Sequence, residues 1–159
     1  MSMNKYIRLA ILLLRLSLGW YFFYAGLAKV TNPAWSAAGY LGGAQTFSGL
    51  FAWFASPQNI GWVNFLNEWG LVLVGAALLL GFGVRFASLC GITFMLLYYF
   101  PTLHFPYAGA HAYLVDEHVI VLVALLLLYT AKAGKYFGIS ALLARTRLSS
   151  YPWMRLILN

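Results

Sequence analysis

Three charged residues lie in stretches of sequence that are otherwise apolar: Arg15, Glu68 and Glu117. A charged side chain at the centre of a membrane helix costs about 2.5–3.5 kcal/mol on insertion scales. Such residues usually face a partner or a cavity inside the membrane, where they take part in transport, proton transfer or ligand binding. The pattern therefore predicts a polar site within the membrane, with these three side chains as its candidate catalytic groups.

The chemistry of this site depends on whether the three side chains lie at one depth. A rise of 1.5 Å per residue places Arg15 roughly 13 Å from the inner edge, and Glu68 and Glu117 roughly 21–22 Å from it. With the length of the arginine side chain, all three would reach one layer. Arg15 would supply a fixed cation, Glu68 would accept or relay a proton, and Glu117 with His118 would carry protons outward. The alternative is a buried ion pair that holds the helices in register and binds nothing.

The first apolar segment indicates how Arg15 is positioned. Arg15, Gly19, Phe22, Gly26 and Lys29 are separated by four, three, four and three residues, which places them on one face of a helix. The two glycines would let a neighbouring helix approach closely. Lys29 would then lie near the outer mouth of the site, where it either binds an anionic substrate or extends into the interface as an anchor.

The composition identifies a membrane protein. Of 159 residues, 63% are hydrophobic and only 8% are charged, and the mean hydropathy is +0.80. Soluble domains carry about 25% charged residues, so this sequence has too few of them to cover a soluble surface. The net charge of +7 fits loops that face anionic lipid and calls for no nucleic acid.

Four transmembrane helices are predicted, and they form an all-α, four-helix transmembrane bundle. A span needs about 20 residues, which three apolar segments provide, whereas the fourth is short and would continue through a kink at Pro101 toward His104. The segments are Leu9–Ala28, Ile60–Val84, Ala112–Ala131 and the short Phe86–Phe100. Residues 1–140 would be the transmembrane domain, and residues 141–159 a basic amphipathic cytoplasmic tail.

Charges in the loops predict the orientation. With four spans, the eight basic residues of the termini and of the loop at Arg85 all fall on one side, as the positive-inside rule expects. We therefore expect the inner membrane, with both termini cytoplasmic. A fifth span would place the C-terminal cations on the wrong side, so Pro33–Pro57 is interpreted as an outer loop with one or two interfacial or re-entrant helices.

Aromatic residues make up 18% of the chain and gather toward the predicted outer half. An interfacial belt explains much of this content. The alternative is a slot for a flat lipophilic ligand such as a quinone, for which Trp20, Tyr24 and Trp69 are candidate binding residues together with Lys29 and His118.

Metal and cysteine chemistry find little support in the sequence. The three histidines, His104, His111 and His118, lie in one connection and are weak candidate metal ligands, because no known ligand motif is present. Hydrogen-bonding and helix-capping roles suit them better, and Asp116 is expected near the positive end of the last helix. Cys90 is the only cysteine, so the chain has no C-x-x-C redox pair and no haem-attachment motif.

These motifs, in their order, resemble the DoxX family of membrane proteins, and most closely its DoxD-like branch. The matching segments are Leu14–Gly19, Tyr24–Lys29, Asn67–Gly70, Leu79–Gly81, Arg85–Ala87, Val115–His118 and Ala133–Lys135. In that branch the protein is the membrane subunit of thiosulfate:quinone oxidoreductase, which also has a DoxA subunit.

The resemblance implies a function for the predicted polar site. It implies a quinone-linked oxidoreductase subunit that passes electrons from a sulfur compound such as thiosulfate to membrane quinone. Quinone would be the bound ligand or substrate, with no haem, flavin or metal evident, and the partners would be the lipid bilayer and a second subunit or another copy of the chain. The alternative function is a non-enzymatic scaffold or assembly factor whose Arg/Glu cluster is structural.

Overall fold

The structure is a computed structural model that describes residues 4–109 and 111–143. Within these two ranges the chain is helical and contains no β-strand. The elements are α1 (Lys5–Val30), α2 (Ala38–Gly42), α3 (Ser48–Ala55), α4 (Ile60–Leu80), α5 (Val84–Thr102), α6 (Glu117–Thr130), η1 (Ala133–Lys135) and α7 (Ile139–Leu143). The predicted tail begins within α7, and its residues from 144 onward lie outside the described part of the chain.

In the described part of the chain, three helices are long and apolar enough to cross a membrane: α1, α4 and α5. The predicted fourth span is shorter than expected, because α6 has 14 residues and extends roughly 21 Å. It begins at Glu117 because the carboxylate of Asp116 accepts hydrogen bonds from the backbone amides of His118 and Val119, and so caps the helix. Residues 112–115 therefore belong to the preceding loop.

Two other expectations about the elements are confirmed. Helix α5 includes Pro101 and ends at Thr102, so the short third segment does continue through its proline. The segment Pro33–Pro57 forms two short helices, α2 and α3, in place of a span. The side chain of Asn64 in α4 accepts a hydrogen bond from the Ala37 amide and so ties this segment to the bundle.

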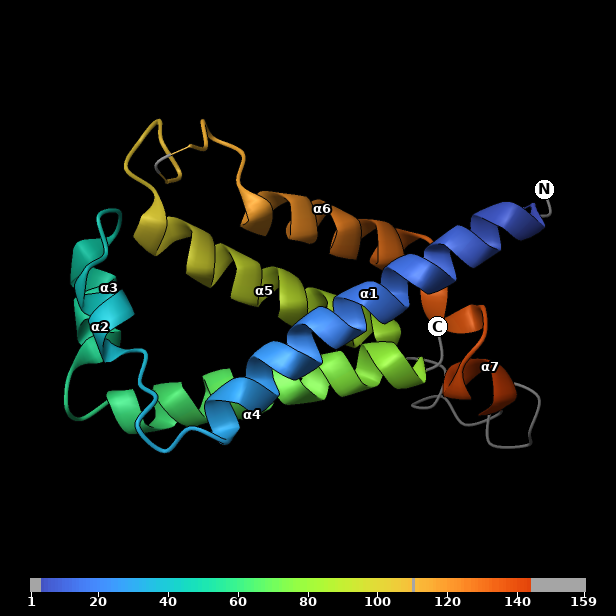
Figure 1. Cartoon of the computed structure of the whole chain (residues 1–159), viewed down its shortest axis with the longest axis horizontal. Helices are drawn as coiled ribbons and strands as arrows, with labels where there is room; N and C mark the ends of the chain where they lie inside the picture. The colour runs from blue at the N-terminus through green and yellow to red at the C-terminus, as the bar shows by residue number, and fades with distance from the viewer. Residues whose placement is uncertain (1–3, 110, 144–159) are drawn as a thin grey trace.

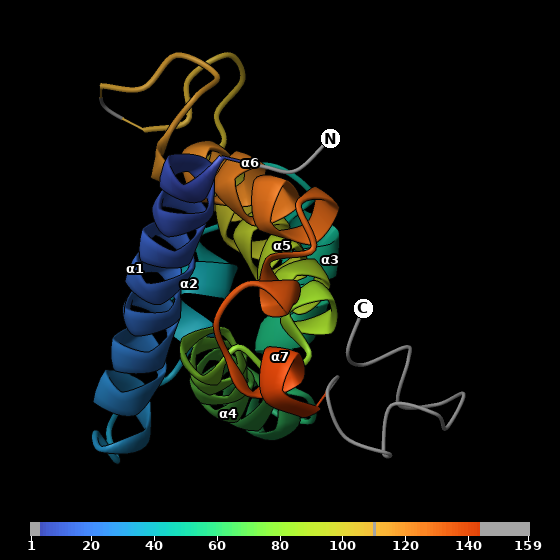
Figure 2. The ribbon, with the colours of Figure 1, turned by 90° about the vertical axis from the view of Figure 1, so that its right-hand side faces the viewer.

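The long helices pack as two pairs, α1 with α4 and α5 with α6. Helix α1 runs obliquely, from the side of α6 at its N-terminus to the side of α4 at its C-terminus (Figure 1, Figure 2). We call the end that carries the start of α1 and α7 the terminal end, and the end that carries α2, α3 and residues 103–116 the loop end. Since α1 leaves α6 as it runs toward the loop end, the two pairs separate there.

Close contact between α1 and α4 depends on glycine. Arg15, Gly19, Phe22 and Gly26 are all buried on one face of α1, which confirms the predicted stripe. A Cβ at Gly26 would lie 2.6 Å from the backbone nitrogen of Val72, and one at Gly75 would lie 2.5 Å from the Cα of Phe23. The two backbones can therefore meet only where side chains are absent.

Replacing Gly75 by alanine is expected to lower the free energy of unfolding by about 1–3 kcal/mol, because the new methyl group meets backbone atoms that cannot move aside. Gly61, in the same helix, has open space around its missing Cβ, and its replacement by alanine should stabilise by up to about 1 kcal/mol. Thermal unfolding in detergent micelles compares the two variants. Equal melting temperatures would contradict the packing described here.

Candidate functional site

Arg15 lies at the terminal end of the bundle, where it binds backbone carbonyl groups. Its side chain is 2% exposed, and Nη1 donates to the carbonyls of Ala133 and Tyr136 at 3.2 and 3.1 Å. Gly81, with a φ of +67°, is also adjacent, since a Cβ there would lie 2.8 Å from Nη1. Arg15 thus joins α1 to the segment that follows α6 and to the end of α4.

The end of one helix makes this position favourable for a cation. Helix α4 ends at Leu80, next to the Gly81 that contacts Arg15. A helix C-terminus carries roughly −0.5 of an elementary charge on its unpaired carbonyls. This end and the carbonyls of Ala133 and Tyr136 stabilise the guanidinium without a carboxylate, and the chain has only three acidic residues in all.

The prediction that Arg15, Glu68 and Glu117 share one layer is wrong. Arg15 lies beside Gly81, and Glu68 precedes Gly81 by 13 residues of α4, roughly 20 Å. Glu117 begins α6, whereas Arg15 contacts residues beyond the end of that helix. Among residues 4–109 and 111–143, the only ion pair joins Asp116 to His118. The predicted common depth is wrong because Arg15 lies at the terminal end of the bundle, whereas Glu68 and Glu117 lie toward the loop end.

The two glutamates have different surroundings. Glu68 is half-buried on the face of α4 that meets α1, since its carbonyl oxygen would lie 3.0 Å from a Cβ at Gly26. Glu117 is exposed at the first turn of α6. Neither carboxylate has a hydrogen bond to another part of the described chain, and no catalytic role follows for them from their contacts.

Polar side chains from four helices surround Tyr98 at the loop end. Its hydroxyl donates to Oδ1 of Asn67 at 2.9 Å, and its carbonyl accepts from the hydroxyl of Tyr40. The ring lies 5.9 Å from Nζ of Lys29 and 6.0 Å from the ring of His118. Two predicted binding residues, Lys29 and His118, are therefore brought together around a tyrosine that the sequence analysis did not select.

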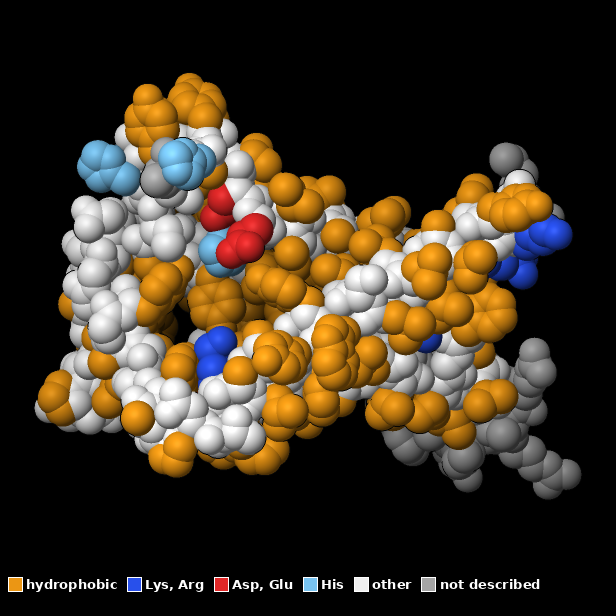
Figure 3. Space-filling view, in the orientation of Figure 1, with side chains coloured by type: hydrophobic (Ala, Val, Ile, Leu, Met, Phe, Trp, Pro, Cys, Tyr) orange, Lys and Arg blue, Asp and Glu red, His pale blue; other side chains and the backbone are white. Residues whose placement is uncertain are grey.

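His118 is held by its neighbour Asp116. Its Nδ1 lies 2.6 Å from Oδ2 of Asp116, and the other carboxylate oxygen accepts from two backbone amides at the start of α6. A hollow is visible at this end of the molecule, with a cationic side chain on one rim and acidic and histidine side chains on the opposite rim (Figure 3). We call Lys29, Asn67, Tyr98, Asp116 and His118 the Tyr98 cluster.

An apolar groove runs between α4 and α5, passes Asn67 and Tyr98 of this cluster, and reaches α2 and α3. Its volume is about 850 Å³, and its lining extends along α4 from Trp62 to the Phe82 that follows the helix, roughly 30 Å. The exposed side chains Leu66, Leu73 and Phe86 form part of its rim, so the groove opens sideways. Polar groups in its lining come from Tyr40, Asn67, Thr93 and Tyr98.

The polar groups at the loop end of the groove are suited to hydrogen bonding at neutral pH. Burial raises the pKa of Tyr40 to about 12, so its hydroxyl remains a donor and holds the backbone of Tyr98. Asn67 uses its carbonyl oxygen for Tyr98, and its amide NH₂ has no hydrogen-bond partner in the described ranges. A ligand with a carbonyl group can take that donor.

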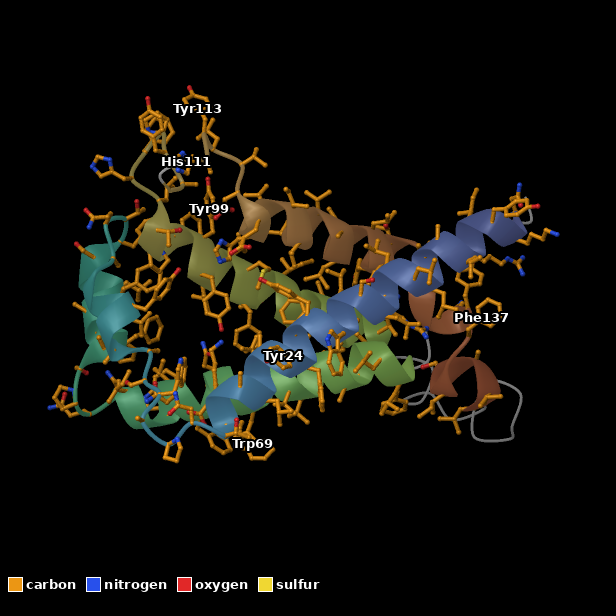
Figure 4. All side chains as sticks on the ribbon, in the orientation of Figure 1. Tyr24, Trp69, Tyr99, His111, Tyr113 and Phe137 are labelled. Carbon is orange, nitrogen blue, oxygen red and sulfur yellow. The ribbon has the colours of Figure 1, made fainter. Side chains whose placement is uncertain are left out.

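The remaining predicted residues do not join this cluster. Trp20 and Tyr24 stack on each other on the exposed surface of α1, and Trp69 is exposed on α4. His104 and His111 are exposed in the loop that follows α5, and Figure 4 shows His111 and Trp69 on opposite sides of the molecule. In the described ranges no three His, Cys, Asp or Glu side chains gather as metal ligands.

Sequence reasoning missed Asn67 and Tyr98, and it gave Asp116 only a capping role. Asn67 is next to Glu68, but the two face different helices, because Asn67 contacts α5 and Glu68 lies against α1. The available signal was the pair of polar residues Asn64 and Asn67, one turn apart in an apolar helix. Two asparagines in an apolar helix are a weaker indication of a site than the charged residues Arg15, Glu68 and Glu117.

Comparison with known proteins places the chain in a family. No curated protein and no solved structure matches it significantly. The DoxX family model matches residues 10–104, from the start of the buried stripe of α1 to the end of α5, and so includes the groove and three of the residues of the Tyr98 cluster. Since the match covers more than half of the sequence, the chain belongs to the DoxX family, and with its long apolar helices it is a membrane protein of that family.

Proposed function

We propose that this protein binds a membrane quinone in the groove between α4 and α5 and serves as the membrane subunit of a quinone-linked oxidoreductase. One observation carries the proposal: a long apolar groove, open at its side, has hydrogen-bonding groups toward its loop end. A quinone has the matching form, with a flat head that accepts hydrogen bonds and a long isoprenoid chain. Ligand pockets typically combine such an apolar lining with a few placed polar groups.

The head group would lie beside Tyr98, with the amide of Asn67 donating to one quinone oxygen. The chain would follow the apolar part of the groove past Val74 and Ala77 toward Phe86. This proposal moves the quinone from Arg15 and Glu68 to the other side of α4. Trp20, Tyr24 and Trp69 would face lipid and serve as interfacial aromatics.

The proposal also includes the orientation of the bundle in the membrane and the class of the electron donor. The cations near the start of α1 and after α6 would place the terminal end in the cytoplasm of an inner-membrane protein, with α6 as a short fourth span. The loop end would then face outward, where Lys29 would attract an anionic sulfur compound such as thiosulfate. A second subunit or a second copy of the chain would complete the enzyme.

Filling the groove should remove the quinone. Thr93 is exposed in α5 and lines the groove, whereas Leu96 is exposed in the same helix outside it. We expect Thr93→Trp to lower the quinone retained by mildly purified protein at least tenfold and Leu96→Trp to leave it unchanged. Solvent extraction and mass spectrometry measure the retained quinone. If wild type retains none and binds no added short-chain quinone, the proposed function is wrong.

A second candidate function is a membrane scaffold or assembly factor, and the contacts of Arg15 favour it. Arg15 binds backbone carbonyls at the terminal end and does not line the groove, so the most unusual charge in the chain supports the fold. A scaffold would lose stability on substitution of Arg15 and would bind no quinone. Quinone extraction from the wild type distinguishes the two functions directly.

A further inference from the structure

Asp116 and His118 form a pair whose geometry suits proton exchange. The carboxylate can only accept, so the 2.6 Å contact to Nδ1 means that this nitrogen carries a proton. The other ring nitrogen, Nε2, is then the one that gains and loses a proton. A carboxylate that fixes the tautomer and stabilises the imidazolium is the usual arrangement for a histidine acid or base.

The pair lies near the part of the groove in which the quinone head is proposed to bind. The ring of His118 lies against Tyr98, whose hydroxyl and whose partner Asn67 line the loop end of the groove. Side chains of Asp116 and His118 are 11% and 17% exposed, so the pair also reaches the solution at the loop end. The pair does not itself line the groove, but it lies between the solvent and Tyr98, which does.

We propose that Asp116 and His118 are the proton-exchanging pair of the quinone site and that they draw protons from the loop end. The inference rests on the proposed quinone function. Reduction of a quinone to a quinol takes two electrons and two protons. The electrons come from a reduced sulfur anion, and each proton passes from Nε2 of His118 to a quinone oxygen through water beside Tyr98 and is replaced from solution.

The groove is less polar toward the terminal end. Its lining there comes from Leu73, Val74, Ala77, Phe82 and Phe86, with Cys90 and Thr93 on α5 as its polar side chains. Arg15 is near that end, but its side chain is buried against carbonyl groups. We therefore expect the protons to enter from the loop end.

Ionisable groups from several helices surround the pair. Helix α6 contributes Glu117 beside Asp116, and α5 contributes Tyr98. Helix α1 contributes Tyr21 and, on the other side of Tyr98, Lys29. Tyr40 on α2 lies within electrostatic range of Asp116.

The test uses full-length protein in nanodiscs loaded with decylubiquinone and reduced by dithionite in a stopped-flow instrument, so that it does not depend on the physiological donor. Asp116→Asn keeps a good helix cap but removes the charge, and His118→Gln removes the titrating ring. We expect both variants to reduce the bound quinone at least tenfold more slowly at neutral pH, with the dissociation constant of the quinone within twofold of wild type.

The pH profile separates proton transfer from a structural effect. In wild type the rate should fall with rising pH, because the pair takes its protons from solution. In His118→Gln and in Asp116→Asn this dependence on pH should be lost or flattened. His111→Gln, in the exposed loop at the same end, is the matched control and should follow wild type.

Each other outcome has a definite meaning. If both variants bind quinone and keep the wild-type rate and profile, Asp116 and His118 only cap the helix and this inference is wrong while the proposed function stands. If the slow rate follows Glu117→Gln in place of Asp116→Asn, the pair is wrongly assigned. If wild type binds no quinone, the proposed function fails, and this inference fails with it.

Discussion

Replacing Arg15 by methionine is expected to lower the free energy of unfolding by about 3–5 kcal/mol, because one buried and one partly buried carbonyl group lose a charged donor. Methionine fills a similar volume, so the loss would reflect the removed hydrogen bonds more than a cavity. The region around α7 should loosen first, since Arg15 and the contact of Ser140 with Gly81 hold it to the bundle. Thermal unfolding in detergent, followed by tryptophan fluorescence, measures the effect.

Two further variants show whether geometry or charge matters at this position. Arg15→Lys keeps the charge but presents a single ammonium in place of a planar fork, so about half of the lost stability should return. Lys135→Met removes an exposed cation from the same end and should change stability by less than about 0.5 kcal/mol. Unfolding of Arg15→Met at the wild-type temperature would contradict the structural role described here.

The helices could be predicted from the sequence because hydrophobic length and glycine spacing act locally. Apolar runs of about 20 residues gave α1 and α4, and the spacing from Arg15 to Gly26 gave the buried face of α1. Pro33–Pro57 was excluded as a span by the distribution of cations, and it forms α2 and α3. The length of α6 was overestimated because Asp116 caps the helix inside an apolar run.

The partners of the charged residues could not be predicted in the same way. Every residue has a carbonyl group, so the sequence carries no mark of the two carbonyls that bind Arg15. The chain also has only three acidic residues, so an ion pair with Glu68 or Glu117 was the obvious side-chain contact to predict for Arg15. Counting residues along a helix does not give the side of the bundle that a residue faces, which is why Asn67 was passed over in favour of Glu68.

Asn67 and Glu68 are adjacent but face different helices, and replacing each of them in turn gives the sharpest test of the groove. Asn67→Leu should weaken quinone binding about tenfold to a hundredfold, which corresponds to about 1–3 kcal/mol. The substitution removes the amide that would donate to the quinone and leaves the hydroxyl of Tyr98 without its acceptor. The dissociation constant of decylubiquinone in nanodiscs, measured by calorimetry, gives the effect, and the melting temperature checks that the fold is kept.

Tyr98→Phe and the double variant complete a cycle that tests whether the two residues act together. Because the tyrosine hydroxyl donates to Asn67, removing both groups should cost less than the sum of the single losses. Glu68→Gln tests the alternative position of the quinone, because it alters the carboxylate on the α1 side of the same helix. Loss of quinone from Glu68→Gln, with normal binding by Asn67→Leu, would move the ligand out of the groove and toward α1.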